Sequence, residues 1–118
     1  MRSFLLVLTL AICASAHAAD STSLESQKIA YQIASIETLQ GAQFIRNGTA
    51  YNGSAAADHL RLKLRNAGSR VVTADDFIRL CASTSSVSGI PYQIRFADGR
   101  VVSSETYLRE KLAEFSHE

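Results

Sequence analysis

The chain has 118 residues, and its 12 lysines and arginines nearly balance its 11 aspartates and glutamates, giving a formal net charge of +1. The charges are interspersed, and no block of one sign is long enough to indicate binding to nucleic acid or to a membrane surface. The length suits one domain, and no repeat, low-complexity tract or linker divides it.

The N-terminus has the layout of a secretory signal peptide. A basic residue near the start is followed by the charge-free apolar run FLLVLTLAICA over residues 4–14, and then by small-residue steps of the A-x-A type. The run is shorter than the roughly 20 apolar residues of a membrane span. We therefore expect residues 1–18 to be removed after Ala18, or alternatively after Ala16, which leaves residues 19–118 as a single exported domain.

Two cysteines bear on processing and redox chemistry. Cys13 could be the acylated cysteine of a lipoprotein, but the bulky Ile12 before it is a poor fit to such processing. Once the signal peptide is removed, Cys81 is alone, so no internal disulfide is expected. We interpret Cys81 as an inert buried thiol, with a reactive thiol as the alternative.

The first predicted element is a helix over residues 23–40. Thr22 and Glu25 form a capping box at its start, and isoleucines recur behind them at helical spacing. Gly41 is a suitable stop at its C-terminal end.

The stretch RNGTAYNGS can be interpreted as two glycosylation acceptors or as two tight turns. Asn47-Gly48 lies between two short runs of aromatic and β-branched residues, which predicts a type I′ hairpin. Asn52-Gly53 is expected to turn the chain into the next helix, with Ser54 as its N-cap. The hairpin register would pair Arg46 with Thr49, Ile45 with Ala50, and Phe44 with Tyr51.

The segment HLRLKLR, from His59 to Arg65, is ambiguous because its strict alternation is typical of a strand. The alanines before it, its strong helix formers and its lack of β-branched residues favour a helix instead. We therefore predict a helix over residues 55–67. Thr73 begins another helix, on which Phe77 and Cys81 share the buried side.

The run STSSVSGIP cannot continue that helix through its glycine and proline. Residues 92–96 alternate apolar and polar side chains and predict a strand, which Asp98-Gly99 turns into a second hairpin. A last helix follows, capped by Ser103 or Ser104. The expected fold class is α+β, a small single domain in the order helix, β-hairpin, two helices, β-hairpin, helix.

The sequence patterns of common active sites are missing. The chain has no H-E-x-x-H, no paired cysteine or histidine spacing for a metal, no phosphate-binding glycine loop and no G-x-S-x-G, so we expect no cofactor and no metal site. His59 is the one plausible general base, and a serine of the 83–88 run, such as Ser86, could meet it in a hydrolase. The same serines are equally natural in a polar turn.

Several motifs occur in a fixed order: F-I-R-N-G, then H-L-R-x-K, then A-S-x-S-S-x-S-G-x-P-Y-x-I-R and a closing D-G hairpin. The set runs from about Ile33 to Leu112 and resembles a family of small bacterial exported proteins catalogued as a domain of unknown function. No catalytic role comes with the resemblance. The matching positions are Phe44, Arg46, Asn47, Gly48, His59, Leu60, Arg61, Lys63, Phe77, Ser83, Ser85, Ser86, Ser88, Gly89, Pro91, Tyr92 and Arg95.

The chain departs from the family pattern at two positions. Many family members carry cysteines where this chain has Ala42 and Phe96, and a bridge between those cysteines would make the two hairpins neighbours. The resemblance therefore implies that apolar packing replaces such a bridge here. Neighbouring hairpins would bring polar side chains onto one surface. The candidate binding residues are Arg46, Asn47, His59, Lys63, Ser86, Ser88, Tyr92 and Arg95.

The sequence therefore favours a non-enzymatic binding or interaction module of the bacterial cell envelope, periplasmic or secreted. Its partner would be an envelope protein or a small anionic ligand, since several candidate residues are basic. The alternatives are a small hydrolase that uses His59 and Ser86, or a structural or regulatory subunit of an envelope complex. Nothing indicates nucleic-acid binding, and no membrane span is expected after removal of the signal peptide.

Overall fold

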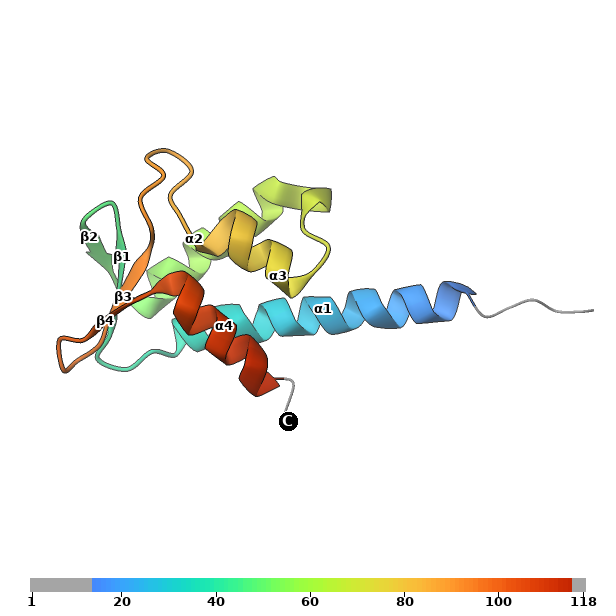
Figure 1. Cartoon of the computed structure of the whole chain (residues 1–118), viewed down its shortest axis with the longest axis horizontal. Helices are drawn as coiled ribbons and strands as arrows, with labels where there is room; N and C mark the ends of the chain where they lie inside the picture. Colours follow the sequence, from blue (N-terminus) through green and yellow to red (C-terminus); the bar gives the residue numbers. More distant parts are fainter. Residues whose placement is uncertain (1–13, 116–118) are drawn as a thin grey trace, which may run out of the picture.

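The computed structural model describes residues 14–115, with side chains from residue 21 onward, and shows an α+β domain with the predicted order of elements (Figure 1). Most of the apolar run that predicts a signal peptide, including Cys13, lies outside the described residues. The elements are α1 (Ala14–Glu37), β1 (Gln43–Arg46), β2 (Thr49–Tyr51), α2 (Gly53–Ala67), η1 (Gly68–Arg70), α3 (Ala74–Phe77), η2 (Ile78–Ala82), β3 (Gln93–Arg95), β4 (Val101–Ser103) and α4 (Ser104–Phe115).

The first hairpin has the predicted register. Asn47 and Gly48 connect its strands with positive φ angles of 51° and 77°, as a type I′ turn requires. The second hairpin joins β3 to β4, and all four strands form one antiparallel sheet in the order β2-β1-β3-β4. The observed pairs of the first hairpin are Phe44 with Tyr51, Ile45 with Ala50, and Arg46 with Thr49.

The two hairpins are neighbours because β1 pairs with β3. Gln43 lies opposite Arg95 in this pairing, so the next step of the register places Ala42 opposite Phe96. Ala42 is buried, and Phe96 is partly buried against the core. The contact between hairpins that the family resemblance implied is therefore confirmed, with apolar side chains at the two positions.

The helices pack on one face of the sheet, and the core lies between the two layers (Figure 1). Phe44 and Ile94 are buried on that inner face, whereas Gln93 and Arg95 are exposed on the other. Strand alternation accounts for the difference between the two faces. The helices contribute Ile36, Leu60, Phe77, Ile78 and Leu108 to the fully buried core.

α1 begins at Ala14 and ends at Glu37, so the predicted start at residue 23 is wrong, and Thr22 lies inside the helix. Alanines dominate residues 14–19, and because alanine has the highest helix propensity, the helix extends upstream of the predicted cap. The N-terminal part of α1 projects beyond the other elements (Figure 1). No helix within residues 14–115 is sufficiently long and apolar to span a membrane.

The predicted N-cap of α2 is also wrong. Asn52 takes that place instead of Ser54, and its Oδ1 accepts a hydrogen bond from the Ala55 amide at 2.8 Å. Gly53 is required next to the cap, because a Cβ there would lie 2.5 Å from the Ile36 carbonyl oxygen near the end of α1. The close approach of α2 to α1 therefore fixes where α2 begins.

The two middle helices otherwise follow the prediction. The segment from His59 to Arg65 is helical and lies within α2. Thr73 caps α3 and forms a capping box with Asp76, after which the helix widens to π geometry in η2. Cys81 in η2 is buried and unpaired, and burial raises the pKa of its thiol, so the sulfur stays protonated at neutral pH.

Candidate functional site

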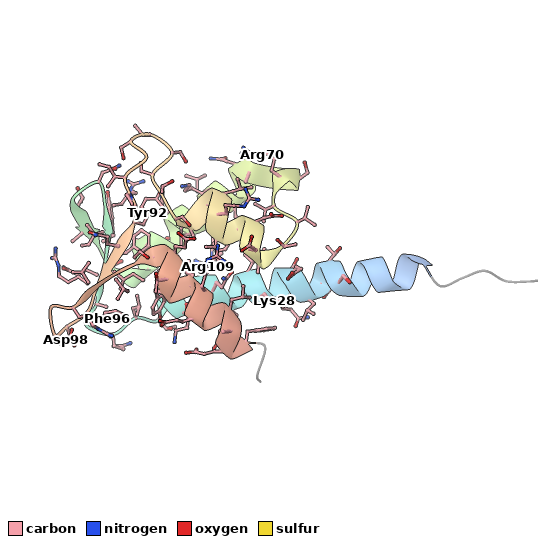
Figure 2. The ribbon with its side chains drawn as sticks, viewed as in Figure 1. Lys28, Arg70, Tyr92, Phe96, Asp98 and Arg109 are labelled. Carbon is pink, nitrogen blue, oxygen red and sulfur yellow. The ribbon has the colours of Figure 1, made fainter. Side chains whose placement is uncertain are left out.

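A polar cluster lies at one end of the inner face of the sheet. Arg46, the last residue of β1, points to the same face as the buried phenylalanine two positions before it. Continuing the β1–β3 register places Arg46 opposite Tyr92, which lies at the base of the 83–91 loop (Figure 2). α2 packs on this end of the sheet and supplies His59 and Lys63, one helical turn apart.

The Arg46 guanidinium stacks on the His59 ring. One of its terminal nitrogens is 3.1 Å from Nδ1 and 3.0 Å from Nε2 of the imidazole. An atom almost equidistant from both ring nitrogens cannot lie along the in-plane lone pair of either, so it lies over the ring face. The other terminal nitrogen donates to the Tyr51 hydroxyl at 3.0 Å. These neutral partners hold the guanidinium in place without cancelling its charge.

Tyr92 links Lys63 to His59. The Lys63 ammonium donates to the Tyr92 hydroxyl at 3.0 Å and to the Thr84 carbonyl oxygen at 2.9 Å. The Tyr92 hydroxyl in turn lies 3.3 Å from His59 Nε2. Because an ammonium only donates, the tyrosine oxygen accepts from Lys63, and the hydroxyl thereby connects the ammonium to the imidazole.

Asn47 connects the first hairpin to the serine loop, which we define as residues 83–91. Its side-chain nitrogen donates to Ser85 Oγ at 3.2 Å, and its Oδ1 accepts a hydrogen bond from the Ser88 hydroxyl. Ser85 is buried, and its Oγ also accepts from the amides of Val87 and Ser88. Asn47 thus serves the hairpin turn through its backbone and holds the serine loop through its side chain.

The first hairpin, α2 and the serine loop line a hollow of about 340 Å³ that is open to solvent. This volume is near the lower end of small-molecule sites, which span about 300–1,000 Å³. The hollow therefore suits a small ligand or one group of a larger one. The residues that line it are Arg46, Asn47, His59, Leu62, Lys63, Asn66, Ser85, Ser86, Val87 and Tyr92.

The hollow is positively charged. Neither Arg46 nor Lys63 forms an ion pair with a carboxylate in the described part of the chain. Partial burial lowers the pKa of His59, and the nearby charges of Arg46 and Lys63 lower it further. The imidazole is therefore neutral at pH 7, and the cluster carries the charges of the arginine and the lysine alone. The basic residues that do form ion pairs are Lys28, Arg61, Arg79, Arg109 and Lys111.

Most of the predicted binding residues meet at this hollow, but Arg95 does not. It alternates in β3 with the buried Ile94, so it points to the outer face of the sheet. There it donates to the Gln43 side chain at 3.3 Å. Ser88 reaches the cluster through Asn47. The other predicted residues, Arg46, Asn47, His59, Lys63, Ser86 and Tyr92, line the hollow itself.

Sequence reasoning missed several residues of this cluster. The predicted hairpin register already placed Tyr51 diagonally across from Arg46, so that contact could have been found. Leu62 and Asn66 share one helix face with His59, since residues three and four apart are neighbours on a helix. Ser85 and Val87 carried no such signal, because the loop is irregular and Ser85 differs from the other serines of the loop in its burial, which depends on tertiary contacts.

The geometry expected of a serine hydrolase is not formed. Among the described side chains, His59 has Arg46 and Tyr92 as its partners, and no serine oxygen lies within hydrogen-bond distance. A carboxylate usually orients the histidine of such a site, but three aspartates of the helices pair with arginines instead. Asp58 pairs with Arg61, Asp75 with Arg109, and Asp76 with Arg79. Within the described residues, no group of three or more His, Cys, Asp or Glu side chains could hold a metal ion.

A larger groove, of about 580 Å³, lies between α1 and α2. Apolar side chains dominate its lining, among them Ile29, Ile33 and Leu64. Arg61 is the charged residue in the lining, and Glu37 and Asp58 both pair with it. Ligand sites usually combine an apolar pocket with a few convergent polar groups. Because the groove offers no unpaired charge, the smaller hollow is the better candidate site.

Comparison with protein families gives a match over residues 23–116 to the family of unknown function DUF5329. The chain belongs to this family. Every residue that lines the hollow of this DUF5329 domain lies within the matched range. The chain is also similar to the uncharacterized protein YfeK of Salmonella typhimurium (strain LT2), with 53% identity over 49 residues, which is 42% of this chain and 41% of that protein. No solved structure matches the chain.

Proposed function

We propose that this protein is a non-enzymatic binding module whose hollow takes a small anionic group. The observation that carries the proposal is the convergence of Arg46 and Lys63 on one open hollow, where neither has a carboxylate partner among the described residues. Guanidinium and ammonium groups bind carboxylate and phosphate oxygens through charge-assisted hydrogen bonds.

The cations are positioned before any ligand arrives. Arg46 lies between the His59 ring and the Tyr51 hydroxyl, and Lys63 is held by Thr84 and the Tyr92 hydroxyl. Side chains that are already ordered lose little entropy when they bind a ligand. Only part of the donor capacity of each cation is used by these contacts, so N–H groups remain for an anion.

The test is a titration of the purified chain with sodium phosphate and with sodium acetate at constant ionic strength, monitored through backbone amide shifts by NMR. We expect the shifts to centre on α2, the first hairpin turn and the serine loop. Arg46→Gln should weaken binding about tenfold or more, since a hydrogen bond to a charged group contributes about 1.5–3 kcal/mol.

The matched control is Arg95→Gln, which removes the same charge from the exposed outer face of the sheet. It should leave the affinity unchanged within about twofold, because dissolved salt screens the interaction between an exposed, distant charge and the bound anion. An equal loss of affinity in the two variants would indicate general charge attraction and contradict a site at the hollow.

We also propose that the module acts in the bacterial cell envelope after export. The support is the N-terminal sequence, with its basic start, apolar run and A-x-A steps. Fractionation of cells that express the full chain should give a shortened protein in the periplasm or the medium. A chain that lacks residues 1–18 should stay in the cytoplasm. Recovery of the full-length, unprocessed chain from the cytoplasm would contradict export.

A further inference from the structure

The hollow has an apolar side as well as a charged one. Leu62 and Val87 both belong to its lining, and they are 45% and 95% exposed. Single exposed apolar residues are common on protein surfaces and need no explanation. Here two of them line one small hollow, one from α2 and one from the serine loop, together with two cations that have no carboxylate partner among the described residues. Ligand sites have this composition, with apolar walls and a few convergent polar groups.

The position of Leu62 follows from the helix. Leu62 and Lys63 follow His59 by three and four residues, so both lie beside it on the part of α2 that lines the hollow. The buried stripe of α2, which includes Leu60, faces the core instead. Leu62 therefore adds nothing to the core of the described domain, and its side chain remains available to a ligand.

The position of Val87 follows from the hydrogen bonds of its loop. Its own amide donates to the buried Ser85 Oγ at 3.3 Å, and the Gly89 amide donates to the Ser85 carbonyl oxygen at 2.9 Å. The Ser88 hydroxyl donates to Asn47 Oδ1 in the hairpin turn. These bonds fix the loop backbone, so the exposed valine is presented by an ordered turn beside the charged groups.

We infer that the hollow takes an oxyanion that carries a short aliphatic chain, with the anion at Arg46 and Lys63 and the chain between Leu62 and Val87. This inference rests on the proposed anion-binding function and narrows it to a ligand class. Carboxylate and phosphate share the chemistry that the two cations recognise. The volume of about 340 Å³ limits the chain to a few carbons.

The experiment compares acetate, butyrate and hexanoate, and also phosphate and butyl phosphate, in titrations of the purified chain at constant ionic strength. Each added methylene should tighten binding about two- to fourfold until the chain outgrows the hollow, because that is the gain from partial to full burial of a CH₂ group. A gain in affinity with ligand length in the carboxylate series, the phosphate pair or both supports the inference. A gain in one of them alone identifies the headgroup.

Serine substitutions test where the aliphatic part of the ligand binds. In Leu62→Ser/Val87→Ser the ratio of hexanoate to acetate affinity should fall to near one. Val72→Ser is the matched control, since Val72 is 66% exposed but lines the groove between α1 and α2. It should leave the ratio unchanged. All these positions are exposed, and circular dichroism would verify that the variants stay folded.

The possible failures are distinguishable. Binding of acetate or phosphate without any gain from the aliphatic chain would overturn this inference and leave the proposed anion site standing. The gain in affinity with ligand length could also persist in Leu62→Ser/Val87→Ser and be lost in Val72→Ser. That result would place the aliphatic part of the ligand in the groove between α1 and α2 and would overturn the inference as well. Failure of every anion to bind would overturn the inference and the proposed function together.

Discussion

Two concave surfaces of this molecule use opposite faces of α2. Toward α1, Leu64 and Arg61 line a groove whose walls are mainly apolar and whose charged residue is paired with Glu37 and Asp58. Toward the sheet and the serine loop, His59 and Lys63 line a smaller hollow in which positive charge remains unpaired. The availability of charge, rather than volume, therefore marks the candidate site.

The two faces of α2 are expected to have different roles. The face toward α1 holds the helices together, so substitutions there should lower the free energy of unfolding. If the face toward the serine loop binds a ligand, as we propose, substitutions there should lower affinity and change stability less.

The largest effect is expected at the junction of α2 with α1. Gly53→Ala should lower the free energy of unfolding by about 3 kcal/mol, because its methyl group would overlap the carbonyl oxygens of Ile36 and Glu37. Urea denaturation monitored by circular dichroism measures this. Ser54→Ala is the control and should change stability by less than about 0.5 kcal/mol, since Asn52 caps the helix. Equal effects of the two changes would show that the close approach does not constrain α2.

On the opposite face, Lys63→Met should separate affinity from stability. Methionine keeps the apolar stem but loses the ammonium, so phosphate affinity should fall tenfold or more, about 1.4 kcal/mol. The free energy of unfolding should change by less than about 1 kcal/mol, because the lysine is only partly buried. Arg61→Met, on the groove side, should leave phosphate affinity unchanged. A matching loss of affinity in Arg61→Met would remove the distinction between the two faces.

A smaller effect is expected where Asn47 joins the hairpin to the serine loop. Asn47→Gly keeps a residue suited to positive φ but loses the hydrogen bonds to Ser85 and Ser88. Stability should fall by about 1 kcal/mol, and amide exchange in residues 83–91 should become faster. Asn47→Ala should cost more, because it also strains the turn. Unchanged exchange in Asn47→Gly would show that the serine loop holds its shape without Asn47.

The smallest effect is the dependence on pH. Because the pKa of His59 is lowered in the folded chain, its contribution to stability is fully present above the ordinary pKa of 6.5 and is lost as pH falls through the lowered pKa. Over the same fall in pH, the protonated ring adds a positive charge and anion affinity should rise. His59→Gln should remove both changes. Parallel pH curves for wild type and His59→Gln, between about pH 7 and pH 5, would contradict this assignment.

The hairpins show what local sequence can establish. Asn47-Gly48 alone was enough to predict the turn and every pair of the first hairpin, since a type I′ turn determines the register. The prediction that Arg95 lies at the binding surface could have been corrected from the sequence by strand alternation. The alternation of Arg95 with Ile94 in a half-buried strand already placed the arginine on the outer face, away from Arg46.

Other features depend on contacts between distant parts of the chain. Asn52 and Ser54 are both good caps, and the choice between them is made by Gly53 against the end of α1. The serine loop has several similar hydroxyls, and Asn47 of the hairpin turn contacts two of them, those of Ser85 and Ser88. Neither contact has a local signal in the sequence, so neither could be predicted from it.

The central claim is that the unpaired charges at the hollow form an anion site. The most direct measurement compares the phosphate affinity of wild type, of Arg46→Gln/Lys63→Gln and of the charge-matched Arg61→Gln/Arg95→Gln, at constant ionic strength. We expect a loss of about a hundredfold or more in the first variant and a change within about twofold in the second. Equal losses in the two variants, or no binding of phosphate or carboxylate by wild type, would contradict this claim.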